Sequence, residues 1–316
     1  MHRAWRHWIS SNLARVAAYT LLPILLVGCA TPAAYRDPIT RFQQASTVVI
    51  EGARVEYGLA NKRERDAAID KLVDKKAKID LKALGNQDLI LLTPDDLSMR
   101  MSALDTLSKH AQLLLALASS DAPTKAADAA NSLDDALLGL STSLGNAPSS
   151  ELKNKAAGFA SIAAEITKLA LESKITQALD KAIALSEKDV TALIRLIGND
   201  MSGLNARQRS IFSERRVRAV DDYNNELAKT PPNVDKLRAA ASEIKKTEDE
   251  WANSYLSPAG SLGLDAMAQA HAKLVTYAKS SKQPQDLAAL IEATDAFVTR
   301  ATVIANAIKT IRNAKE

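Results

Sequence analysis

The chain has 316 residues with nearly balanced charge, 41 lysines and arginines against 37 aspartates and glutamates. Three arginines lie in residues 1–28, which carry no acid, so the remaining chain has 38 basic against 37 acidic residues. Such a balance provides no electrostatic basis for binding nucleic acid, and we predict no nucleic-acid partner. Because Cys29 is the single cysteine, no disulfide can form within the chain, and a hydrophobic core must hold the fold together.

The N-terminus has the order of features that is typical of a secretory signal. Arginines come first, and an apolar run at 21–27 follows them. This run contains Pro23 and is shorter than the roughly 20 residues of a membrane-spanning helix. We therefore predict a signal peptide over residues 1–28, ending in Leu26, Val27 and Gly28.

Leu26, Val27, Gly28 and Cys29 resemble the lipobox of bacterial lipoprotein precursors. The resemblance covers about the first 30 residues. It implies cleavage before Cys29 and attachment of acyl chains to its sulfur and its new amino group. In Gram-negative lipoproteins an aspartate directly after the cysteine commonly retains the protein in the inner membrane. Because Ala30 stands at that position, the resemblance implies anchoring at the periplasmic face of the outer membrane.

A short segment connects this cysteine to the rest of the chain. Residues 29–37 include Pro32 and end in Asp37, which Pro38 follows. A capping residue followed by proline at the first helical position is typical of a helix start. We therefore expect a lipidated tether over 29–37 and a helical domain over 38–316.

From Pro38 onward, apolar residues recur at helical spacing, with few strand signals. Thr93-Pro94, Ser186 and Asn233 carry the capping pattern of helix starts. The segment 73–93 is the least helical, so the first helix is expected to end near it, and its apolar residues 89–92 favour a buried link. Amphipathic helices are predicted around residues 97–118, 126–144, 237–255 and 287–311.

Two segments predict longer helices. Residues 150–185 carry apolar stripes on opposite faces, so this helix is either central or changes its partner midway. Residues 187–229 carry one apolar stripe that shifts phase near Phe212, which resembles a stutter, and would be about 65 Å long if unbroken. The chain therefore predicts an all-α fold, an elongated up-and-down bundle of seven to eight helices, two of them long.

Patterns for enzyme chemistry are weak. His110 and His271 are 161 positions apart, and neither lies in a metal-binding motif, so each is interpreted as a face or edge residue of its helix. Ser150 and Ser242 match S-x-x-K, but the chain lacks the S-D-N and K-T-G motifs that accompany it in penicillin-binding enzymes. We predict no catalytic residue, no metal site and no cofactor.

Five arginines within twelve positions form what we call the arginine cluster. At about 100° per residue they are distributed around the helix. The functional interpretation is contact with an anionic surface, such as lipid head groups or the acids of a partner. The alternative is ion pairing with neighbours such as Glu214, Asp221 and Asp222. The cluster consists of Arg207, Arg209, Arg215, Arg216 and Arg218.

These features predict an outer-membrane lipoprotein on the periplasmic side, held to the membrane by its lipid on Cys29. We expect it to act as a non-enzymatic interaction or scaffold module of the cell envelope, with an envelope protein as partner. Two alternatives stay open: a membrane-active protein whose amphipathic helices repack into a bilayer, and an enzyme acting on envelope components.

Overall fold

The computed structural model describes residues 32–79, 91–119, 123–143, 164–172, 174–256 and 259–313. The described residues are almost entirely α-helical and contain no strand, which confirms the predicted all-α bundle. A short helical stretch covers 164–171. The longer helices are α2 (Pro32–Asp74), α4 (Pro94–Ser119), α5 (Pro123–Ser143), α7 (Ile175–Leu227), α8 (Val234–Leu256), α9 (Ala259–Lys279) and α10 (Pro284–Asn313).

The capping residues begin α4 and α8 where the sequence predicts. The hydroxyl of Thr93 accepts a hydrogen bond from the N–H of Asp96, and the Asp96 carboxylate accepts one from the N–H of Thr93, each 3.1 Å long. This reciprocal arrangement satisfies two N–H groups that the first turn of α4 leaves without helical partners. In α8 the side chain of Asn233 accepts hydrogen bonds from the N–H groups of Asp235 and Lys236.

Helix α2 begins at Pro32, six residues before the start predicted at Pro38, so the expected tether 29–37 is helical from Pro32 onward. The reason is tertiary: Tyr35 is fully buried, and its ring packs edge-on against Tyr277 of α9 at 4.9 Å. Its hydroxyl also donates a hydrogen bond to Asp180 of α7. These contacts compensate for Pro38, which lies inside the helix and has no N–H to donate.

The two long helices are α2, with 43 residues, which was not predicted to be long, and α7, with 53. The helix start predicted at Ser186 is wrong, because α7 continues through that buried residue without a break. The helix predicted over 150–185 is not continuous, because a helical stretch ends at 171 and α7 begins at Ile175. The N–H of Lys174 donates a hydrogen bond of 3.0 Å to the carbonyl of Leu169, at the C-terminal end of the 164–171 helix. Ile166 and Leu169 of one stripe thus lie in the 164–171 helix, whereas Ile175, Leu179 and Ile183 of the other lie in α7. Residues 150–163 of the predicted helix lie outside the described residues.

Long-range contacts define the directions of the helices. Tyr35 meets Asp180 near the start of α2 and α7, and Asp70 meets Arg215 further along, each pair 145 positions apart. The two long helices therefore run parallel and in a constant register. Helix α4 runs antiparallel to α2. Asn61 in the second half of α2 bonds to both backbone groups of Leu92 just before α4 begins, whereas Arg36 near the start of α2 donates to the carbonyl of Ser119 at the end of α4.

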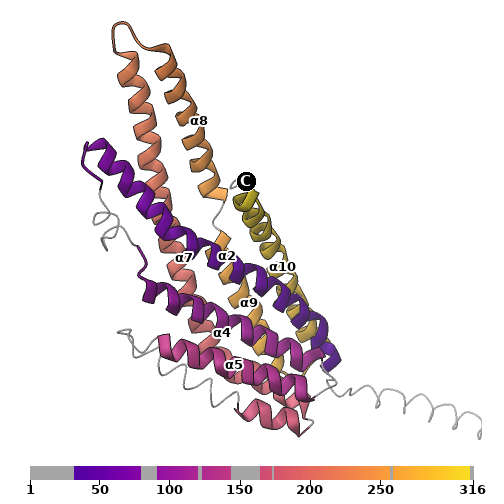
Figure 1. The fold of residues 1–316 in the computed structure, drawn as a ribbon. Helices are drawn as coiled ribbons and strands as arrows, with labels where there is room; N and C mark the ends of the chain where they lie inside the picture. The colour runs from indigo at the N-terminus through magenta and orange to yellow at the C-terminus, as the bar shows by residue number, and fades with distance from the viewer. Residues whose placement is uncertain are drawn as a thin grey trace, which may run out of the picture.

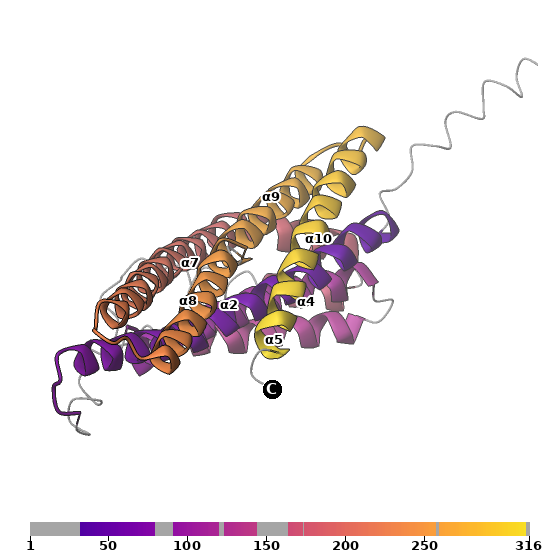
Figure 2. The same cartoon turned by 90° about the horizontal axis from the view of Figure 1, so that it is seen from above.

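Helices α8 and α9 run antiparallel to α7. Helix α9 packs along the first half of α7, and α8 packs along the second half. Lys279 of α9 pairs with Glu187 near the start of α7, whereas Glu250 of α8 pairs with Arg215 nearer its end. Helix α5 covers α4, and α10 packs on α2 and α9. In Figure 1 the α7–α8 hairpin extends beyond the other helices at one end, and α2 begins at the opposite end. Figure 2, the view from above, likewise shows the start of α2 at the opposite end from the hairpin.

The core lies where α2, α4, α7, α9 and α10 meet. Phe42 of α2 and Phe297 of α10 are fully buried with their ring centroids 5.7 Å apart. Glycines allow a close approach of backbones nearby: a Cβ at Gly263 would lie 2.3 Å from a side-chain carbon of Ile304, and one at Gly52 would lie 2.8 Å from another. These glycines bring α2, α9 and α10 into direct contact.

Candidate functional site

Cys29 and the lipobox residues Leu26, Val27 and Gly28 lie outside the described residues. The other sequence-derived candidate, the arginine cluster, lies in the second half of α7, where α7 packs between α2 and α8. Arg207 donates hydrogen bonds through two nitrogens to both carboxylate oxygens of Glu64 on α2, which lowers the pKa of that carboxyl. Arg218 pairs with Asp74 of α2 at 3.0 Å.

Arg215 links three helices. Its Nε lies 3.2 Å from a carboxylate oxygen of Asp70 on α2, and its Nη1 lies 3.5 Å from Glu250 on α8. Arg216 pairs with Glu248 of α8. The guanidinium of Arg216 also lies over the ring of Trp251, 5.4 Å from its centroid.

The structure therefore shows the ion-pairing alternative for four of the five arginines. Their acidic partners come from α2 and α8 rather than from the neighbours in α7 that sequence reasoning named. Glu214, one of those neighbours, instead pairs with Lys71 of α2. An anionic surface that binds the cluster has to compete with these internal carboxylates.

We expect Arg215→Gln to lower the free energy of unfolding by about 1 kcal/mol at low salt and by less at high salt, because partly exposed ion pairs are screened. Urea unfolding at the two salt concentrations measures this difference. The matched control is Arg238→Gln, since the ion pair of Arg238 with Asp235 is almost fully exposed. An equal effect of the two substitutions would contradict the linking role of Arg215.

Sequence reasoning did not connect the two histidines that the structure brings together. His110 of α4 is 1% exposed and His271 of α9 is fully buried, and their ring centroids are 5.4 Å apart. Each lies on the apolar stripe of its helix, His110 between Leu107 and Leu114 and His271 beside Leu274. That spacing was the available signal for their burial, although it does not show that they meet.

The two rings have few polar partners. Nε2 of His110 lies 3.5 Å from the hydroxyl of Ser186 on α7, which itself donates to the carbonyl of Ala182 at 2.6 Å. Neither ring nitrogen of His271 has a hydrogen-bond partner among the described residues. Burial lowers the pKa of both rings, that of His271 to about 4 despite the opposing effect of Glu187. Both rings are therefore neutral at neutral pH.

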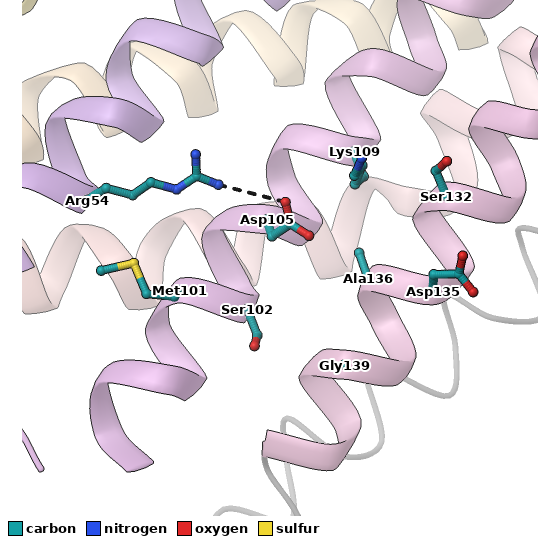
Figure 3. Close-up of a pocket in the computed structure, with 9 residues that line it drawn as sticks. All are labelled: Arg54, Met101, Ser102, Asp105, Lys109, Ser132, Asp135, Ala136 and Gly139. Carbon is teal, nitrogen blue, oxygen red and sulfur yellow. Dashed lines mark ion pairs between the residues drawn. The ribbon is translucent and has the colours of Figure 1, made fainter. Parts of the chain in front are cut away.

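A polar groove of about 510 Å³ lies between α2, α4 and α5 (Figure 3). In Figure 3 Arg54 reaches from α2 toward Asp105 of α4, and the distance between their charged atoms is 3.8 Å. Lys109 and Asp135 add one further charge of each sign, so the groove has no net charge. No histidine is among the described residues that line it, and the hydroxyl of Ser102 lies 3.1 Å from that of Ser143.

We call the exposed apolar residues near the end of the α7–α8 hairpin the hairpin tip. Val220 and Leu227 are seven positions apart in α7 and share a face of that helix. Glu226 stabilises the turn by accepting hydrogen bonds from the N–H of Asn233 and the side chain of Lys229. The hairpin tip consists of Val217, Val220, Leu227 and Val234, which are between 40% and 60% exposed.

Comparison with known proteins shows no matching family model, no matching curated protein and no matching solved structure. No helix among the described residues has the length and apolar character needed to cross a membrane. Within the same part of the chain, no group of three or more histidine, cysteine or acidic side chains is arranged to hold a metal ion.

Proposed function

We propose that this chain is a bacterial lipoprotein that acts as a non-enzymatic interaction module of the cell envelope. Acyl chains on Cys29 would attach it to the periplasmic face of the outer membrane, as the lipobox resemblance implies. The observation that carries the interaction role is the α7–α8 hairpin, which extends beyond the other helices in Figure 1. Apolar side chains near its end are exposed.

The helix directions orient this hairpin relative to the anchor. Helix α2 begins at Pro32, three residues after Cys29, so the chain between them spans at most about 10 Å. Tyr35 and Asp180 hold the beginnings of α2 and α7 together. Helix α7 runs parallel to α2 and is itself 53 residues, about 80 Å, long, so it continues past the end of α2. An anchor on Cys29 would therefore place the hairpin tip at the end of the molecule farthest from the membrane attachment.

The side chains of the hairpin tip favour a protein partner. Exposed apolar residues on a projecting element are typical of protein–protein contact sites. The other candidate sites support enzyme chemistry less well. The histidine pair is closed to solvent, and the groove between α2, α4 and α5 has no histidine beside its serines.

Site-specific photo-crosslinking in intact cells tests the proposal. A photoreactive amino acid at Val220 or Leu227 is expected to give a discrete crosslinked protein in the envelope fraction. The matched control is Val303 of α10, which is 55% exposed but lies on the bundle away from the hairpin. Crosslinks of equal yield at Val303, or no crosslinked protein at either hairpin position, would refute the interaction role of the tip.

A further inference from the structure

We infer that His110 and His271 form an acid-sensitive latch, which holds α4 and α9 together in the core only while both rings are uncharged. This inference is independent of the proposed function, because it needs neither the lipid on Cys29 nor the hairpin tip. It rests on where the rings lie, on what surrounds them and on the absence of a counter-charge at hydrogen-bonding distance among the described residues.

The latch lies where several helices meet. His110 comes from α4 and His271 from α9, and their rings meet edge to face with an interplanar angle of 67°. Phe42 of α2 closes the other side of His271, with ring centroids 6.2 Å apart, and Phe297 of α10 packs behind Phe42. The two neutral imidazoles thus act as aromatic core residues, each filling space between helices that are far apart in sequence.

The charged groups around the two histidine rings would do little to stabilise a protonated imidazole. Helices α2 and α10 present Phe42 and Phe297, and α4 presents His110 itself. Helix α7 presents the hydroxyl of Ser186 and the carboxylate of Glu187, and Glu187 is already engaged by Lys279 of α9 at 2.5 Å. A proton on either ring would therefore place a buried charge beside a second imidazole without a carboxylate partner. Such a charge is costly, so acid favours states in which the rings reach water.

The direction of the pH effect follows from proton uptake. In the unfolded chain His271 has the ordinary pKa of 6.5, whereas burial lowers it to about 4 in the fold. The unfolded chain therefore binds more protons below pH 6.5, and stability that is full above this value is lost as the pH falls toward 4. For His271 alone, the ratio of folded to unfolded chain is expected to fall about thirtyfold between pH 8 and pH 5. His110 acts in the same direction, because burial lowers its pKa as well.

Urea unfolding of the full chain at pH 8 and pH 5, followed by circular dichroism, measures this ratio. Between pH 8 and pH 5, the ratio of folded to unfolded chain is expected to fall by a factor at least ten times smaller in His271→Phe than in the wild-type chain. Phenylalanine fits the aromatic surroundings and cannot take up a proton. The contribution of the carboxylates is common to both chains and cancels in the comparison. Parallel pH profiles of the wild-type chain and His271→Phe would overturn the latch.

A second measurement needs no substitution in the core. The chain has four histidines, so the variant His2→Gln/His7→Gln retains only His110 and His271. NMR signals of their ring C–H groups are expected to keep the neutral chemical shift down to about pH 5, until the fold itself opens. Titration of either ring near pH 6.5 in the folded protein would show that protons enter freely, and the latch would be excluded even if His271→Phe failed to fold.

Discussion

Serine in place of Cys29 is expected to abolish lipid attachment and to leave the precursor with its signal peptide uncleaved. The thiol is the group that the lipobox resemblance assigns to acylation, and a serine hydroxyl is a much weaker nucleophile. Each buried methylene contributes roughly 0.8 kcal/mol, so loss of even five of them weakens membrane partitioning by about a thousandfold. Labelling with a radioactive fatty acid, together with the electrophoretic size of the chain, measures both effects.

The matched control for this substitution lies one residue further along. Ala30→Asp keeps the cysteine, so labelling and cleavage are expected to be normal. The resemblance to Gram-negative lipoproteins implies that this variant shifts from the outer to the inner membrane, which fractionation of the envelope detects. Normal labelling and maturation of Cys29→Ser would refute the lipoprotein interpretation, whatever the control shows.

A large loss of stability is also expected for the substitution Gly263→Ala in α9. The new Cβ would lie 2.3 Å from the terminal carbon of Ile304 and 3.1 Å from a methyl group of Val49. Overpacking of this kind destabilises proteins by about 1–3 kcal/mol, and we expect the upper part of this range because two helices would have to move. Urea unfolding measures the loss. Gly203→Ala in α7 is the control, since nothing lies near its new Cβ, and alanine is expected to stabilise the helix by about 0.5–1 kcal/mol.

A double-mutant cycle identifies the cause of this loss. Ile304→Val removes the carbon that the new Cβ at position 263 would meet, and by itself costs about 1 kcal/mol through the space it leaves. In the double variant Gly263→Ala/Ile304→Val the two defects should partly cancel, so that the combined loss is smaller than the sum by about 1 kcal/mol or more. Strictly additive losses would show that the close contact in the structure is not what limits this position.

Local signals in the sequence predicted helix starts better than helix continuity. Thr93 and Asn233 begin α4 and α8 as expected, because a cap acts through hydrogen bonds within one turn. The start of α2 depends instead on Tyr35, which is held by side chains from α7 and α9. No pattern within residues 29–38 contains that information. The break after residue 171 was also missed, because two stripes in one segment are compatible with one helix or two.

The partners of the arginine cluster illustrate the same limit. The excess of arginine in α7 is visible in the sequence, and so are the acids of α2 and α8. Pairing Arg207 with Glu64, 143 positions away, requires the register between two parallel helices. The register in turn depends on every side chain along the contact, so it cannot be deduced from either helix alone. The histidine pair was missed for this reason as well.

The sequence by itself determined the helical character of this protein, through apolar spacing and caps. It is also the basis of the proposed attachment, through the resemblance of residues 26–29 to a lipobox. Only the tertiary structure decided that α2 and α7 run parallel and that α8 returns along the far half of α7. This difference has a physical reason. Periodicity shows which face of a helix is buried, whereas direction and register are decided by contacts between residues far apart in the chain. Those contacts place the end of the α7–α8 hairpin opposite the end at which α2 begins, and they bring His110 against His271.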